Sequence, residues 1–250
     1  MKKIIKHLKE NWIRHGFETL VITAGILLAF SLNNWNENRI VQNRITSQLE
    51  ALVKSLEVQK EQLDFIRITH MFRYNSLQYI LGMADVTLYV IPDGLEEVAF
   101  EISWFWKAPI PKEQNRKFID LSFSWSGRYA ITSPNTSIAD ELDRSGAYAQ
   151  IKNFELKEAI DHFYNELKWR LTDQTDRSLE KWNDSLIEDG VYYINTADLD
   201  DPIALLKGNR KRLALLRTIV GEAHWFSISA KGLLLEADNL ILLIEEELHH

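Results

Sequence analysis

The stretch GFETLVITAGILLAFSLNNWNEN, residues 16–38, decides the architecture of this chain. Its core, residues 20–32, carries no charged side chain. The apolar run around that core approaches the roughly 17–25 residues that a helix needs to cross a bilayer. We therefore predict a transmembrane helix over residues 17–35.

Two tryptophans support a membrane position for this helix. Trp12 and Trp35 stand on the two sides of the apolar run, and a rise of about 1.5 Å per residue puts them roughly 34 Å apart. That separation suits two aromatic anchors, one at each membrane–water interface. Membrane lipid is therefore the first expected partner.

The charged residues give the span a direction. The first 16 residues carry five basic side chains and one acidic one, although the whole chain has a formal net charge of −7. Positively charged flanks stay on the cytoplasmic side. We therefore expect residues 1–16 to form a cytoplasmic basic amphipathic segment and the C-terminal domain to lie in the periplasm, beyond a bacterial inner membrane. The acidic domain argues against a nucleic-acid partner, which would need concentrated positive charge.

Two other interpretations of the apolar run are open. Ala29-Phe30-Ser31 has the small-x-small form of a signal-peptidase site, which would make the N-terminal segment a cleaved signal peptide. A buried helix of a soluble protein would also be apolar, but the basic prefix and the flanking tryptophans would then be coincidental. We favour an uncleaved signal anchor.

Two stretches resemble a known family. Residues 18–39, ETLVITAGILLAFSLNNWNENR, resemble a family of uncharacterised bacterial single-pass membrane proteins, a domain of unknown function whose span ends in an Asn-Asn-Trp-Asn-Glu motif. Residues 136–167, TSIADELDRSGAYAQIKNFELKEAIDHFYNEL, are similar to the middle region of that family. The resemblance implies a location and an architecture, and it brings no activity with it.

One face of the predicted span favours helix packing. Glu18, Ile22, Gly25 and Ala29 follow spacings of four and three and therefore share one side of the helix. The Gly-x-x-x-Ala spacing lets another helix approach closely, and an ionisable side chain near the membrane usually faces a partner or water. The alternative is that Glu18 simply sits at the level of the lipid headgroups.

After the span, residues 36–82 are expected to continue as a stalk helix. Its heptad-like apolar seam is interrupted only by Gln59 and consists of Ile45, Leu49, Leu52, Leu56, Leu63 and Ile66. Such a seam belongs either to one arm of an intramolecular bundle or to an oligomeric coiled coil, and it is too short to choose between them.

Residues 83–152 are predicted to be an irregular, aromatic-rich segment with short helices. DVTLYVIPDG, residues 85–94, has an extended pattern, whereas LEEVAFEISWFW, residues 95–106, has helical spacing. Ser133-Pro134 signals the start of a further helix, and Gly146 signals its end.

Three tryptophans of this segment are candidates for binding a ligand. Trp104, Trp106 and Trp125 lie among further aromatic residues, and such clusters can stack on a glycan or a peptide. Large aromatic side chains more often pack in a core, however, and residues 104–129 match nothing in the family described above.

Residues 153–250 are expected to complete the same bundle with two long helices, one from about Asn153 to near Asp189 and one from about Asn209 to Leu248. The second has an apolar seam with small side chains in its middle, which favours close antiparallel packing. The predicted fold class is therefore mainly α: a single N-terminal transmembrane helix that continues into an exported bundle of long helices.

Patterns of catalytic residues are weak in this sequence. The chain has no cysteine, which excludes disulfides and thiolate chemistry. Glu158, His162 and Glu166 are spaced four residues apart on one expected helix face, yet they lack the second histidine of a metal-binding pair. We expect a solvated charged face there, with no cofactor, no metal and no enzyme activity.

The expected function follows from architecture rather than chemistry. We expect a non-enzymatic accessory or scaffold subunit that binds a second copy of itself, or a larger membrane assembly, through its span and stalk. A periplasmic sensor or ligand-binding module that uses residues 104–129 is the alternative.

Overall fold

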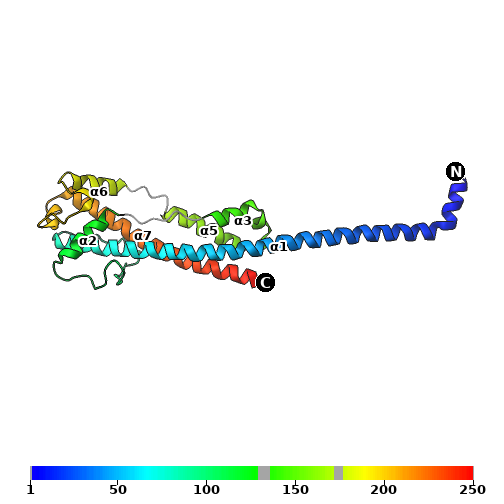
Figure 1. The fold of residues 1–250 in the computed structure, drawn as a ribbon, viewed down its shortest axis with the longest axis horizontal. Coiled ribbons are helices and arrows are strands. Elements are labelled where there is room, and N and C mark those ends of the chain that lie inside the picture. Colours follow the sequence, from blue (N-terminus) through cyan, green and yellow to red (C-terminus); the bar gives the residue numbers. More distant parts are fainter. Residues whose placement is uncertain (1, 129–135, 172–176, 250) are drawn as a thin grey trace.

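The structure, a computed structural model, describes residues 2–128, 136–171 and 177–249 (Figure 1). Those residues form α-helices and two short 3-10 helices, and they contain no β-strand. The expectation of a mainly helical chain is confirmed. One helix, α1, is much longer than the others and carries the apolar stretch near the N-terminus.

Helix α1 (Lys2–Met83) runs without interruption through the predicted span and the predicted stalk. Its 82 residues make about 120 Å of helix. Figure 1 shows its N-terminal part extending well beyond the other helices. The helix ends in a Schellman turn, in which the N–H of Val86 bonds to the oxygen of Leu81 at 3.4 Å. Asp85 takes the left-handed conformation, with φ of 56°, that glycine usually supplies at such a turn.

Helix α7 (Arg210–His249) lies antiparallel to α1, beside the C-terminal half of that helix (Figure 1). The side-chain oxygen of Asn209 accepts a hydrogen bond from the backbone N–H of Arg212 at 3.1 Å and so caps the start of α7. The remaining elements are α2 (Arg116–Ser126), α3 (Ser137–Arg144), α4 (Ala147–Gln150), α5 (Phe154–Leu171), α6 (Arg177–Ile187), η1 (Tyr192–Ile194) and η2 (Pro202–Leu205).

The apolar seam of the stalk is buried within the chain. All six of its apolar residues, and Gln59 between them, are shielded from solvent. The apolar residues form one hydrophobic core with side chains of α5 and of the C-terminal half of α7. The sequence left open whether this seam packs within one chain or in an oligomeric coiled coil. The structure shows that the seam contacts helices of its own chain.

A second core lies at the far end of α1. It joins residues 72–81 of α1 to α2, α6 and the N-terminal half of α7. Around the start of this second core α1 contributes buried polar residues, among them Thr69, His70 and Arg73. Arg73 Nη2 donates to the backbone oxygen of Ser126 at 3.0 Å, which ties α1 to α2 at this point.

The structure describes the single helix expected over residues 153–189 as two elements, α5 up to Leu171 and α6 from Arg177 to Ile187. Residues 172–176 lie outside the described residues. Helix α5 buries Leu167 in the first core, whereas α6 buries Trp182 in the second. This stretch therefore contributes to both cores, one through α5 and the other through α6.

The short helix expected before Gly146 is present in part. Ser133-Pro134, its expected start, lies outside the described residues. Helix α3 is followed by Gly146, whose positive φ of 73° matches the end signal seen in the sequence.

Residues 84–115, which we call the strap, connect α1 to α2 without any helix or strand. The helix expected over residues 95–106 is therefore wrong. The extended conformation expected for residues 85–94 stays a prediction, and a turn lies at Gly94, where φ is 87°.

Side chains of the two long helices hold the backbone of the strap. Gln78 binds both backbone groups of Tyr89, donating at 2.8 Å and accepting at 3.0 Å. Asn75 donates to the oxygen of Val98 at 3.1 Å, and a ring nitrogen of His224 lies 2.7 Å from the oxygen of Glu96. These bonds to distant residues replace the intrahelical bonds that the local spacing had suggested.

Candidate functional site

The apolar start of α1 is an exposed surface. Within the described residues, α1 is the one helix long and apolar enough to cross a membrane. Its 18-residue apolar window has a mean hydropathy of 1.5, and none of that window is buried inside the protein. Apolar surface of this extent is unfavourable in water. The segment is therefore suited to lipid or to a protein partner.

The predicted helix-packing face lies open on this segment. Glu18, Ile22, Gly25 and Ala29 are all exposed. A Cβ atom added at Gly25 would meet nothing within 4 Å, so the space over this position is empty. The role of the face as a packing surface stays a prediction.

The predicted interface anchors differ in what the structure describes. The side chain of Trp12 lies outside the described part of the chain. Trp35 is exposed, and the guanidinium of Arg39 lies 5.2 Å from the centroid of its ring. Asn33 Nδ2 donates to Glu37 Oε1 at 2.7 Å. Such aromatic and polar contacts suit a membrane–water interface, and anchoring itself stays a prediction.

Residues 33–44 of α1 form a neck between the exposed apolar segment and the packed part of the helix. The side chains of the neck are exposed, apart from a half-buried Val41. Val41 packs against the first core, and full burial begins at Ile45. The neck amounts to about 18 Å of helix.

The three candidate ligand-binding tryptophans have different environments. Trp125 packs edge-on against Phe105, with ring centroids 4.5 Å apart. Trp106 packs in the same way against Phe118 at 4.9 Å. Trp104 stacks on Phe105, but 59% of it remains exposed. Trp106 and Trp125 therefore contribute to packing, and Trp104 is the member of the set that presents its ring to solvent.

A groove of about 400 Å³ lies between α1, α7 and the strap. Arg67 Nη1 bonds Glu101 Oε1 at 2.8 Å, and Lys231 pairs with Glu96. Burial by itself would lower the pKa of Arg67, but its hydrogen bonds to Glu101 and Asp64 raise that pKa above its usual value. The two basic side chains of the groove are therefore both in ion pairs with its glutamates. None of the three tryptophans lines the groove.

The charged residues of α5 are spread over separate contacts. His162 Nε2 lies 3.8 Å from Glu236 Oε2 on α7, whereas Glu166 accepts from Arg170 at 2.6 Å. Glu158, the third member of the spacing, is exposed. Among the residues that the structure describes, no group of three or more His, Cys, Asp and Glu side chains could hold a metal ion. His162 and Arg170 instead link α5 to α7.

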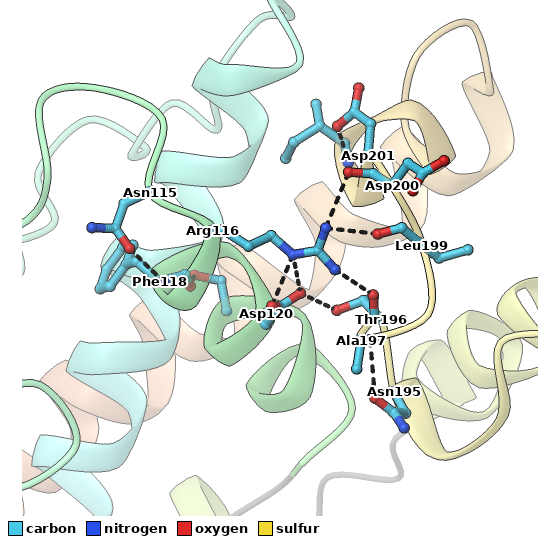
Figure 2. A network of polar contacts seen from close by, with 12 residues as sticks. Asn115, Arg116, Phe118, Asp120, Asn195, Thr196, Ala197, Leu199, Asp200 and Asp201 are labelled. Atoms are coloured by element: carbon cyan, nitrogen blue, oxygen red, sulfur yellow. Dashed lines mark hydrogen bonds and ion pairs between the residues drawn. The ribbon is translucent and has the colours of Figure 1, made fainter.

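A polar network around Arg116 was not predicted from the sequence (Figure 2). Asn115 accepts from the backbone N–H of Phe118 at 3.0 Å and caps α2, which places Arg116 in the first helical turn. Arg116 Nε then donates to Asp120 Oδ2 at 2.9 Å, one turn further along. The spacing of this pair was the only signal of the network in the sequence.

The other donors of Arg116 hold a distant loop. The two Nη groups donate to the backbone oxygens of Thr196 at 2.7 Å and of Leu199 at 2.6 Å (Figure 2). The hydroxyl of Thr196 donates to Asp120 Oδ1 at 2.6 Å and closes the network. The planar, forked guanidinium thus fixes the loop before η2 and α7 onto α2. The network has a structural role.

Comparison with known protein families, curated proteins and solved structures finds no match to this chain. The resemblance of residues 18–39 and 136–167 to a family of single-pass membrane proteins therefore stays a prediction. The fold and its exposed surfaces define a class: a mainly helical protein with one long apolar N-terminal helix.

Replacing Arg116 with methionine tests the loop clamp. Hydrogen bonds to a charged group contribute about 1.5–3 kcal/mol, and the partial exposure of this side chain reduces that value. We expect Arg116→Met to lower the free energy of unfolding by about 1–2 kcal/mol and to speed proteolysis within residues 196–201. Thermal unfolding in mild detergent and limited proteolysis measure the two effects. The exposed neighbour change Lys117→Met is the control, and equal effects of both changes would contradict the clamp.

Proposed function

We propose that this protein is a non-enzymatic, single-pass inner-membrane protein that acts as an accessory or scaffold subunit through helix–helix contacts of α1. The observation that carries the proposal is that the apolar start of α1 is fully exposed and continues without a break into the folded part of the chain. Because the helix is continuous, the position at which the span docks sets the position of the folded part.

The charge pattern supports a cytoplasmic N-terminus. Basic residues precede the span, and the acidic remainder follows it. In this orientation residues 36–44 place Ile45, the first fully buried residue of α1, about 15 Å of helix beyond the end of the predicted span, on the periplasmic side.

The open face over Gly25 supports a protein partner within the membrane. Lipid tails are as apolar as leucine, so helices in a bilayer associate through close packing rather than through the hydrophobic effect. Gly25 and Ala29 are small and lie one turn apart, so a second helix can approach this part of α1 closely. This contact is the expected basis of the accessory role.

A periplasmic ligand-binding module is the second candidate function. Trp104 favours it, because its exposed ring also lies 6.0 Å from that of Phe65, roughly parallel to it, and two such rings make a stacking platform. Binding of soluble glycans or peptides that is lost in Trp104→Ala, while membrane association remains, would favour this candidate over the accessory role.

Membrane topology is the first test of the proposal. A reporter that is active only in the periplasm, fused after residue 250, is expected to be active. The membrane-bound protein should also retain the basic segment before the span, which N-terminal sequencing or intact mass measures. A mature chain that starts at Leu32 would instead establish a cleaved signal peptide.

Substitution within the span tests the packing face. Gly25→Ile increases hydrophobicity and should leave membrane insertion intact, while its side chain pushes a neighbouring helix away. A loss of about 1–2 kcal/mol of packing corresponds to a roughly tenfold loss of association. Crosslinking and co-purification in mild detergent measure this loss, and Leu27→Ile, on the opposite face, is the matched control. If both variants retain their partners equally, the span serves only as a membrane anchor.

A further inference from the structure

Helix α1 has one side that faces the rest of the chain and one side that does not. Leu56 and Leu63 are fully buried and mark the side that faces α5 and α7. At about 100° per residue, Val58 and Phe65 lie about 160° around the helix from these two leucines. Both are large and apolar, yet they are 55% and 47% exposed. The side of α1 that points away from the other helices therefore carries uncovered apolar side chains.

The same side continues through the neck into the predicted span. Ile40, which is 48% exposed, lies on it, and so do Ala29 and Gly25. We call this side the outward row. Its members follow spacings of three, four or seven and are Ile22, Gly25, Ala29, Asn36, Ile40, Asn43, Ser47, Lys54, Val58, Glu61 and Phe65. The row is roughly 65 Å long, and it ends at Phe65, where Trp104 of the strap lies against the helix.

From this row we propose that a second copy of this chain packs in parallel against α1. The inference rests on the proposed function, because it names the partner of the same helix. Two copies in one membrane enter the bilayer in the same direction, so their α1 helices are parallel. A two-fold axis between them places each residue of the row opposite its own counterpart.

The uncharged members of the row fit such self-pairing. Small and apolar side chains pack against their own kind, as at Gly25 and Val58. Asn36 and Asn43 each carry a donor and an acceptor, so the amide of one copy can bond the amide of the other. Asparagine in the seam of paired parallel helices also fixes their register.

One pair of charged residues in this region is complementary between two copies. Lys54 lies in the row, and Glu50 lies one turn before it at the edge of the same side. Neither forms an ion pair within the described part of the chain. In a parallel pair, Lys54 of each copy can reach Glu50 of the other across the axis, so the lysine in the row meets an opposite charge.

The side of α1 that packs into the first core lies opposite the outward row. Leu56 and Leu63 mark that side, where α1 shares the first core with α3, α4, α5 and α7. Two copies that meet along the outward row therefore place those helices on the outside of the pair.

Single cysteines test the pairing without background, because the chain contains none of its own. Ser47 lies in the outward row, whereas Gln42, also exposed, lies about 140° away around the helix. A disulfide needs Cα atoms about 4.4–6.8 Å apart, so membranes with Ser47→Cys should give about tenfold more linked dimer on mild oxidation than membranes with Gln42→Cys. Equal linkage at both positions, or linkage at Gln42→Cys alone, would overturn the proposal.

Co-purification of two differently tagged copies is the second test. Val58→Glu places a new carboxylate opposite itself on the axis and should lower co-purification about tenfold. Leu242→Glu is the matched control, because Leu242 is a comparably exposed apolar residue on α7. Circular dichroism confirms that both variants fold. An unchanged yield with Val58→Glu would overturn the proposal.

These tests separate the second copy from the broader function. If Gly25→Ile releases a different protein while tagged copies never co-purify, the accessory function stands and the second-copy inference is wrong. If Gly25→Ile releases nothing and the tagged copies also never co-purify, both are wrong.

Discussion

The antiparallel contact between α1 and α7 is the interaction on which the rest of the structure depends. Along the middle of α7, Ala223, Ala230 and Ala237 recur every seven residues and are fully buried. Their small side chains let the two long helices approach closely, so the leucines of α1 fill the space between them. Both hydrophobic cores are built on this pair, with α5 added to one and α2 and α6 to the other.

The pairing also explains why α1 changes character along its length. From Ile45 onward the helix has partners that bury its seam, whereas before that residue only the half-buried Val41 packs against the core within the described chain. An exposed polar neck and an exposed apolar segment therefore precede the packed stalk on one continuous helix. This order gives the molecule a folded end and an end whose surface needs lipid or another protein.

The sequence predicts the parts of this fold that are long and periodic. The stalk seam and α7 were foreseen because burial on one side of a helix leaves a repeating pattern in the local sequence. The helix expected over 95–106 failed because Gln78 and Asn75, distant in sequence, bond the backbone of the strap instead. The description of this stretch as two elements, α5 and α6, was not foreseen from its local pattern.

The candidate site likewise has residues that the sequence predicts and residues that only the structure shows. Spacing alone placed Gly25 and Ala29 on one face of the helix, but only the structure shows that Val58 and Phe65 lie uncovered on the same side. The Arg116 network escaped prediction because its acceptors are backbone oxygens some 80 residues away. Backbone atoms carry no sequence signal, so such contacts appear only once the fold is known.

The most direct test of this account is a distance along α1 across the neck, because the account requires one rigid helix from the span to the stalk. Spin labels on Glu37→Cys and Gln62→Cys, measured by pulsed electron paramagnetic resonance in lipid nanodiscs, report that distance. Dilution with unlabelled protein restricts the signal to single chains. A continuous helix predicts a narrow distribution near about 38 Å. A broad distribution, or one centred well below that value, would show a flexible or bent neck and contradict the account.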